Sequence, residues 1–190
     1  MQLENGRPVR IRLSQFCEVI GEDRGSVLAI ISRGYAPFNK EMPEGSPTSR
    51  QRTYDGADLV AWLLFSRLRE GGMEARMAGE AVRLSKVCEI AVTERGCVSD
   101  LHLYLWRVEN EAKEQLRRIV GTKADAASLL SAEERVLSLT VVPVDPCYLS
   151  AQAGLYRAGF AMEGRNIFSL PSTDAGTSAR VAEKQRNDAA

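Results

Sequence analysis

The sequence predicts a mainly α-helical fold with an α+β region towards its C-terminus. Over residues 11–92 the apolar residues recur at the three- and four-residue spacing of amphipathic helices, and glycines stand where such helices would end. Beyond residue 98, short segments alternate apolar with other side chains, as strands do. We expect three parts: residues 1–97, the α+β region over residues 98–170, and a flexible tail over residues 171–190, where large apolar side chains are scarce.

The first two expected helices form a pair joined by a turn. The first covers residues 14–20, with Ser14 as N-cap, and ends at Gly21, which accepts the positive φ of a helix C-terminus. The second covers residues 24–33. Its pattern turns four apolar residues inward: Val27, Leu28, Ile30 and Ile31.

This helix pair predicts a surface that binds DNA. Such pairs are common in α-helical proteins, but they are also the helix-turn-helix, whose second helix lies in the major groove with its N-terminal residues against base edges. In that geometry Arg24 and Ser26 are candidates for base contacts. Arg33, at the far end of the helix, is a candidate for a phosphate contact.

Residues 35–54 have the composition of a two-stranded wing with a long tip. Their prolines and glycine favour turns, and the segment is too long for a simple connection between helices. Arg50 and Arg52 stand two residues apart, so on a strand both would point to one face. An ordinary exposed hairpin has the same composition. Read as a wing, the segment adds Lys40, Arg50, Arg52, Thr53 and Tyr54 to the expected DNA-binding residues.

Two longer helices are expected next. One covers residues 56–70, with Asp55 as N-cap and Trp62 in the core, and the other covers residues 74–92. Together with the preceding elements, they complete the pattern of a winged helix-turn-helix.

This order of elements resembles the DNA-binding domain of the MerR family of transcription regulators. The stretch RTYDGADLVAWLLFSRLREGGMEARMAGEAV is similar to that family's pattern of arginine and tyrosine, acidic cap, apolar helix, Leu-Arg-x-Gly turn and further helix. The resemblance ends at about residue 85. At the family's usual Arg-Tyr-Tyr this chain has Leu28, Ala29 and Ile30, and its wing is longer, which leaves room for an excisionase or a phage-type regulator.

Two functions remain open at this point. In the first, the protein is a sequence-specific transcription regulator that binds double-stranded DNA as a homodimer on a two-fold operator. The α+β region then forms the dimer contact or senses a small-molecule or metal effector. In the second, it is an architectural or assembly protein, like an excisionase or a phage terminase small subunit. A winged fold that has lost DNA binding and contacts proteins through the apolar residues 28–30 is a third possibility.

Charge and hydropathy indicate where the protein is located and which partners it binds. The net charge is zero, but five basic residues against two acidic ones leave residues 24–54 with a local charge of +3. No apolar run approaches the roughly 20 residues that span a bilayer, and the N-terminus lacks the apolar core of a signal peptide. We therefore expect a cytoplasmic, nucleoid-associated protein without a membrane partner.

The sequence offers little for catalysis or metal binding. It has one histidine and no P-loop, HExxH, GxSxG or GxGxxG motif, so we do not expect an enzyme or a cofactor. Cys88 and Cys97 resemble the paired thiolates of some MerR-type metal sensors, but only His102 stands near enough in sequence to join them, so no metal site is expected. Cys17 and Cys147 complete the four cysteines, all expected to be reduced.

In the α+β region the expected elements are less regular. We expect a strand over residues 101–107, a helix over 109–120 and a short helix from about residue 124. A strand over 135–144 follows, then a helix over 148–158 and a strand or hairpin over 160–170. In the helix over 148–158, Leu149, Ala153 and Tyr156 share one phase.

Overall fold

The structure, a computed structural model, describes residues 7–38, 53–87, 100–110, 113–131, 135–160 and 169–170. Within these residues the fold is mixed α and β with more helix than strand, as expected. The elements, in chain order, are β1 (Arg7–Pro8), β2 (Ile11–Arg12), α1 (Leu13–Ile20), α2 (Arg24–Ser32), β3 (Thr53–Tyr54), α3 (Gly56–Glu70), α4 (Ala75–Ser85), β4 (His102–Asn110), β5 (Lys113–Gly121), α6 (Lys123–Leu130), β6 (Val136–Pro143), α7 (Val144–Arg157) and β7 (Ser169–Leu170).

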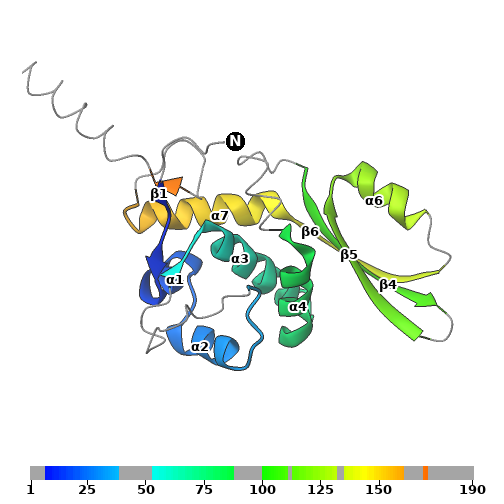
Figure 1. Ribbon diagram of the computed structural model, residues 1–190, viewed down its shortest axis with the longest axis horizontal. Helices are drawn as coiled ribbons and strands as arrows, with labels where there is room; N and C mark the ends of the chain where they lie inside the picture. Colours follow the sequence, from blue (N-terminus) through cyan, green and yellow to red (C-terminus); the bar gives the residue numbers. More distant parts are fainter. Residues whose placement is uncertain are drawn as a thin grey trace, which may run out of the picture.

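Helix α3 lies at the centre of the helical part, with α1, α2, α4 and α7 around it (Figure 1). It begins where expected, because the Asp55 carboxylate accepts a hydrogen bond from the Asp58 N–H at 3.0 Å and Asp58 returns one to the Asp55 N–H at 2.9 Å. Its buried residues lie on every side of the helix: Leu59, Val60, Ala61, Trp62, Leu64, Phe65 and Leu68. A helix buried all round needs cover from several directions.

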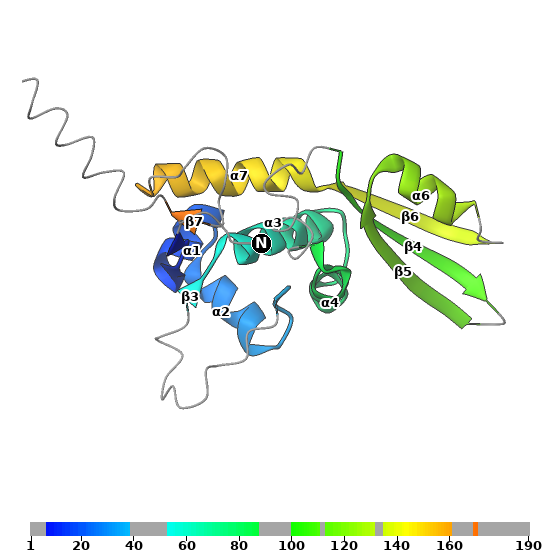
Figure 2. The same cartoon turned by 45° about the horizontal axis from the view of Figure 1, so that its top comes forward.

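Helix α7 supplies one of those covers from the far end of the chain. It follows β6 without a break and lies along α3 and α1 (Figure 2). One continuous buried cluster therefore runs from Val9 to Leu155 and crosses the boundary expected between residues 97 and 98. The residues that α7 turns towards this cluster are Cys147, Tyr148, Ala151, Gly154 and Leu155.

The expected apolar set of this helix points the other way. Leu149, Ala153 and Tyr156 are exposed, and Tyr156 retains 77% of its accessible surface. The helix also begins at Val144 rather than at residue 148, because Pro146 falls in the first turn, where its missing N–H costs no hydrogen bond. The strand before it, β6, confirms the strand expected over residues 135–144.

The sheet contains three antiparallel strands in the order β5, β4, β6. Strand β4 is buried on both faces: Leu103 and Leu105 join the main core, while Tyr104, Trp106 and Val108 pack with Ala126 of α6. Residues 113–121 form β5, so the helix expected over 109–120 is wrong there. Its Lys, Glu, Gln, Leu and Arg residues favour helix, but the full ladder from His102–Gly121 to Asn110–Lys113 outweighs that propensity.

Smaller corrections concern the ends of elements. Helix α1 starts at Leu13, and its N-cap is Arg12, whose N–H donates to the Gln15 side-chain oxygen at 3.0 Å. Ser14 is therefore inside the helix and not its cap. Helix α2 confirms the helix expected over residues 24–33 to within one residue. Helix α4 ends at Ser85, and the remainder of the helix expected to residue 92 lies largely outside the described residues, as do most of the wing and the hairpin.

Glycine is required where α7 crosses α1. A Cβ at position 154 would lie 2.6 Å from the carbonyl oxygen of Val19 and 2.8 Å from its Cγ1. Replacing Gly154 with Ala would normally favour the helix, but here the backbones must separate. We expect Gly154→Ala to lower the free energy of unfolding by about 1–3 kcal/mol in urea titrations. Gly71→Ala is the matched control, since Gly71 has a φ of −74° and its nearest such contact is at 3.4 Å. Equal stability of the two variants would contradict this close packing.

Candidate nucleic-acid interface

The turn between α1 and α2 sets the direction of α2. It comprises residues 21–23, and Gly21 takes a φ of 72°, which a side chain would strain. Asp23 then caps α2, because its carboxylate accepts a hydrogen bond from the Ser26 N–H at 2.9 Å. That hydrogen bond holds the pKa of the exposed Asp23 carboxyl below its ordinary value. Helix α2 thus begins at a defined place immediately after α1.

Glu22, in the same turn, fastens the helix pair to α3. Its Oε1 accepts one hydrogen bond from the Trp62 Nε1–H at 2.8 Å and another from the Ser66 hydroxyl at 2.7 Å. No local pattern in the sequence predicts this contact, since Glu22 lies 40 residues from Trp62. Because Trp62 is fully buried, the start of α2 is held against the rigid centre of the fold.

The outer side of α2 carries the polar residues that the sequence singled out. Arg24, Ser26 and Arg33 are all exposed, while Val27 and Ile30 face the core. Leu28, expected inward, is 41% exposed and stands on the same outer side as Ser32, one turn further along. The helix therefore offers a guanidinium at each end with hydroxyls and one apolar side chain between them.

Strands β2 and β3 form a second exposed element beside this helix pair. They pair antiparallel, with Arg12 opposite Thr53 and Ile11 opposite Tyr54. Thr53 is exposed, but Tyr54 retains only 2% of its surface and stacks on Phe16 with ring centroids 4.4 Å apart. Tyr54 is therefore a core residue, and its burial leaves little surface for the DNA contact expected of it. Lys40, Arg50 and Arg52 lie outside the described residues.

Two exposed arginines, Arg10 just before β2 and Arg12 in it, were not expected at this surface. In residues 9–12, Val9 and Ile11 are fully buried and Arg10 and Arg12 are exposed. That alternation in the sequence Val-Arg-Ile-Arg is a strand pattern with both guanidinium groups on one side. It could have been found, but only the later pairing with Thr53 shows that the segment belongs beside the helix pair.

Several other cations already have protein partners. Arg67 pairs with Glu70 at 3.0 Å, Arg69 lies over the Phe65 ring with its Cζ 5.6 Å from the centroid, and Arg83 donates to the Ala36 carbonyl at 3.3 Å. A phosphate contact made by Arg67 or Arg69 would compete with these interactions. The exposed arginines that lie on or beside the helix pair are Arg10, Arg12, Arg24 and Arg33.

Within the described ranges, no cluster of three or more histidine, cysteine and acidic side chains is arranged to hold a metal ion. Cys88 and Cys97 fall outside those ranges. Cys17 and Cys147 are buried free thiols, and burial raises the pKa of Cys147 to about 11 and also raises that of Cys17. None of the helices described is both long and apolar enough to cross a membrane.

No family model matches the chain, and the search of curated proteins finds no match either.

The Glu22 contacts give a test of how α2 is held. Glu22→Ala removes the acceptor for the Trp62 Nε1–H, so we expect the free energy of unfolding to fall by about 1–3 kcal/mol in urea titrations. Glu22→Gln keeps an acceptor oxygen and should lose less. Glu18→Ala, an exposed position on α1, serves as the control. Identical stability of the Ala and Gln variants would show that these hydrogen bonds do not fix the turn.

The buried thiols give a second test. In a Cys88→Ser/Cys97→Ser variant, we expect the folded protein to resist Ellman's reagent at pH 8 and both remaining thiols to react in urea.

Since the folded-state pKa of Cys147 lies above the ordinary 9.0, its contribution to stability is present below pH 9 and is lost as the pH rises towards 11. Rapid labelling of Cys147 in the native protein would contradict its burial.

Proposed function

We propose that the protein binds double-stranded DNA in a sequence-specific manner and regulates transcription, with α2 as the recognition helix of a winged helix-turn-helix. The main support is the outward side of α2, where Arg24, Ser26 and Arg33 stand exposed on a helix that Asp23 and Glu22 hold at its N-terminus. A rigidly held helix end with exposed donors is suited to base edges in a major groove. The exposed Arg10 and Arg12 are suited to the adjoining phosphates.

The C-terminal part contributes to this proposal indirectly. Because α7 packs on α1 and α3, any partner bound by the sheet is coupled to the orientation of α2. Figure 1 shows the sheet projecting away from the end where α1 and α2 lie. The sheet and the outer side of α2 are therefore accessible to different partners. That arrangement suits a homodimer on a two-fold operator. An architectural or assembly role, like that of an excisionase or a phage terminase small subunit, uses the same helix and remains the alternative.

Substitutions on α2 separate base contacts from phosphate contacts. We expect Arg24→Ala to reduce discrimination between the best site and random DNA by about 1–3 kcal/mol. We expect Arg33→Ala to weaken binding to all sequences and to lower the slope of affinity against salt by about one. Arg50 and Arg52 should behave like Arg33. Fluorescence anisotropy at several salt concentrations measures both effects.

Arg157→Ala, at the exposed end of α7, is the control for general charge loss. If Arg24→Ala and Arg33→Ala bind DNA as the control does, α2 is not the recognition helix. The binding sites come first from a genome-wide footprint of the tagged protein in its own host. Symmetric half-sites near promoters, spaced by one helical turn or a multiple, would support the regulator. Direct or irregular repeats on bent DNA would favour the architectural alternative.

A further inference from the structure

Strand β6 forms an edge of the sheet with no further strand beside it among the described residues. The order β5, β4, β6 gives β6 a single strand neighbour among the described residues. From Val136 to Val141 every residue is exposed, and the four apolar ones keep about two fifths of their surface: Val136 at 38%, Leu137 at 42%, Leu139 at 46% and Val141 at 42%. We call these four residues the β6 strip.

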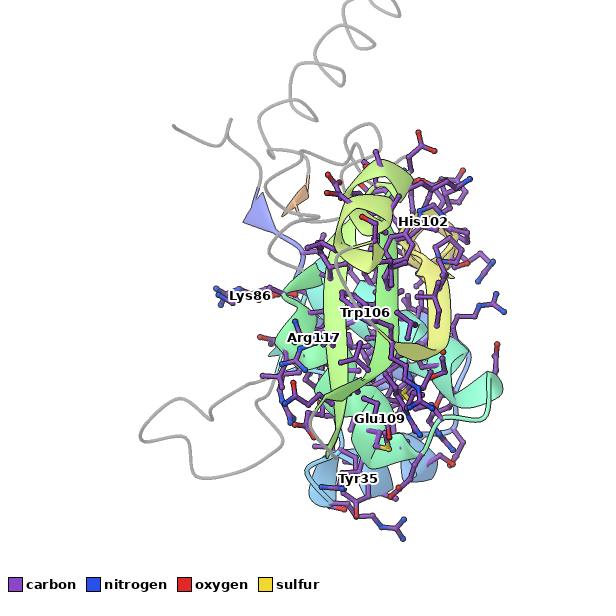
Figure 3. The ribbon with its side chains drawn as sticks, turned by 90° about the vertical axis from the view of Figure 1, so that its right-hand side faces the viewer. Tyr35, Lys86, His102, Trp106, Glu109 and Arg117 are labelled. Atoms are coloured by element: carbon purple, nitrogen blue, oxygen red, sulfur yellow. The ribbon has the colours of Figure 1, made fainter. Side chains whose placement is uncertain are left out.

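The two outer strands of the sheet differ in how they are protected. Strand β5 carries the charged residues Arg117 and Arg118, and Arg117 is exposed beside Trp106 of β4 (Figure 3). Charged side chains are a common way to keep an edge strand from pairing with another chain. Strand β6, with the sequence Val-Leu-Ser-Leu-Thr-Val-Val-Pro, has no charged residue, and its only proline is the last residue. An exposed, uncharged, β-branched edge is a template for strand addition.

The sheet face beneath the β6 strip is also incomplete in one chain. Leu139 lies opposite Trp106 and Val141 opposite Tyr104, on the face that α6 covers over β4. Helix α6 does not extend its cover to β6, and its own Leu129 is 41% exposed. The Tyr104 hydroxyl and the Trp106 Nε1 are both buried there without a hydrogen-bond partner in the described structure. Buried donors without an acceptor are costly, so this face is suited to a further partner.

We propose that β6 pairs antiparallel with β6 of a second copy, about a two-fold axis perpendicular to the sheet, so that the two sheets become one. Because side chains alternate between faces, this symmetry can only place residues of the same face opposite each other. Outside the irregularity between Arg107 and Val108, Leu139 and Val141 share one face. Leu139 therefore faces either Leu139 or Val141 of the second copy, and both arrangements join the β6 strips.

The uncharged edge of β6 is suited to pairing with the same strand of a second copy. Since β6 has no charge, pairing with itself sets no like charges opposite each other, and cross-strand pairs of Val and Leu are favourable. The choice of a second copy rests on the proposed function, which needs a two-fold dimer. The exposed residues of α7, Leu149, Ala153 and Tyr156, form a competing surface that the experiment must separate from β6.

Sedimentation velocity of the full chain without DNA, over a range of concentrations, tests the assembly alone. We expect the wild type to dimerise and Leu139→Lys to raise the dimer dissociation constant about ten-fold or more, since a lysine on an edge strand opposes pairing. Leu149→Lys is matched in exposure, at 46% for both leucines, and should leave the dimer unchanged. Circular dichroism and urea titration establish that each variant is folded.

Two further measurements identify strand pairing itself. Mixing Leu139→Lys with Leu139→Glu should restore a heterodimer, because the two-fold axis brings position 139 of one copy next to position 139 of the other or diagonal to it. Hydrogen exchange of residues 138–142 in the wild type should slow as the protein concentration rises. A monomeric wild type, a dimer lost in Leu149→Lys but kept in Leu139→Lys, or absent rescue in the mixture would each overturn the proposal.

Failure of this proposal is separable from failure of DNA binding. A single half-site measured by anisotropy reports on α2 without the dimer. A protein that prefers the half-site, but forms no dimer or keeps its dimer in Leu139→Lys, overturns the β6 interface and keeps the proposed function. A dimer formed through β6 that shows no preference for any DNA keeps the interface and removes the proposed function.

Discussion

Burial of α3 is the constraint on which the rest of the structure depends. Trp62, Leu64 and Phe65 point in different directions and are all fully buried, so α3 is stable only when other elements enclose it. Phe16 of α1 packs against Trp62 with ring centroids 5.7 Å apart, and α7 covers another side after the chain has passed through the sheet. Removal of either cover would expose apolar surface at the centre, which is why segments so distant in sequence share one core.

The same enclosure explains why α2 can present polar groups outward. Only Val27 and Ile30 of α2 are fully committed to the core, while Glu22 carries the polar attachment to Trp62 and Ser66. A recognition surface needs side chains free to meet a ligand on a backbone that does not move. In this protein the turn and the inner face supply rigidity, and the outer face of α2, with Arg24 and Arg33 at its two ends, is left exposed.

The strands of the sheet differ in how completely their apolar side chains are covered. Strand β4 lies between two strands and is buried on both faces, whereas β6 has one strand neighbour in the described structure and the four residues of its β6 strip are exposed. Strand β6 continues directly into α7, and α7 packs on α1. A partner bound at the β6 edge is therefore connected to α1 through a single helix. The proposed dimer edge and the proposed recognition helix are therefore connected through α7 and α1 within one core.

Local sequence signals determined the elements whose ends carry their own hydrogen-bonding partners or turn residues. Asp55 before residues 56–70, Gly21 after residues 14–20 and the strand pattern over residues 135–144 each predicted an element that the structure contains. The tertiary structure alone decided the elements and buried faces that the sequence pattern mispredicted. Residues 113–121 became a strand because β4 offers a complete ladder, and Tyr54 entered the core because Phe16 lies beside it. The exposure of Leu149 and the hydrogen bond from Trp62 to Glu22 likewise depend on residues that are distant in sequence. No local pattern predicts them.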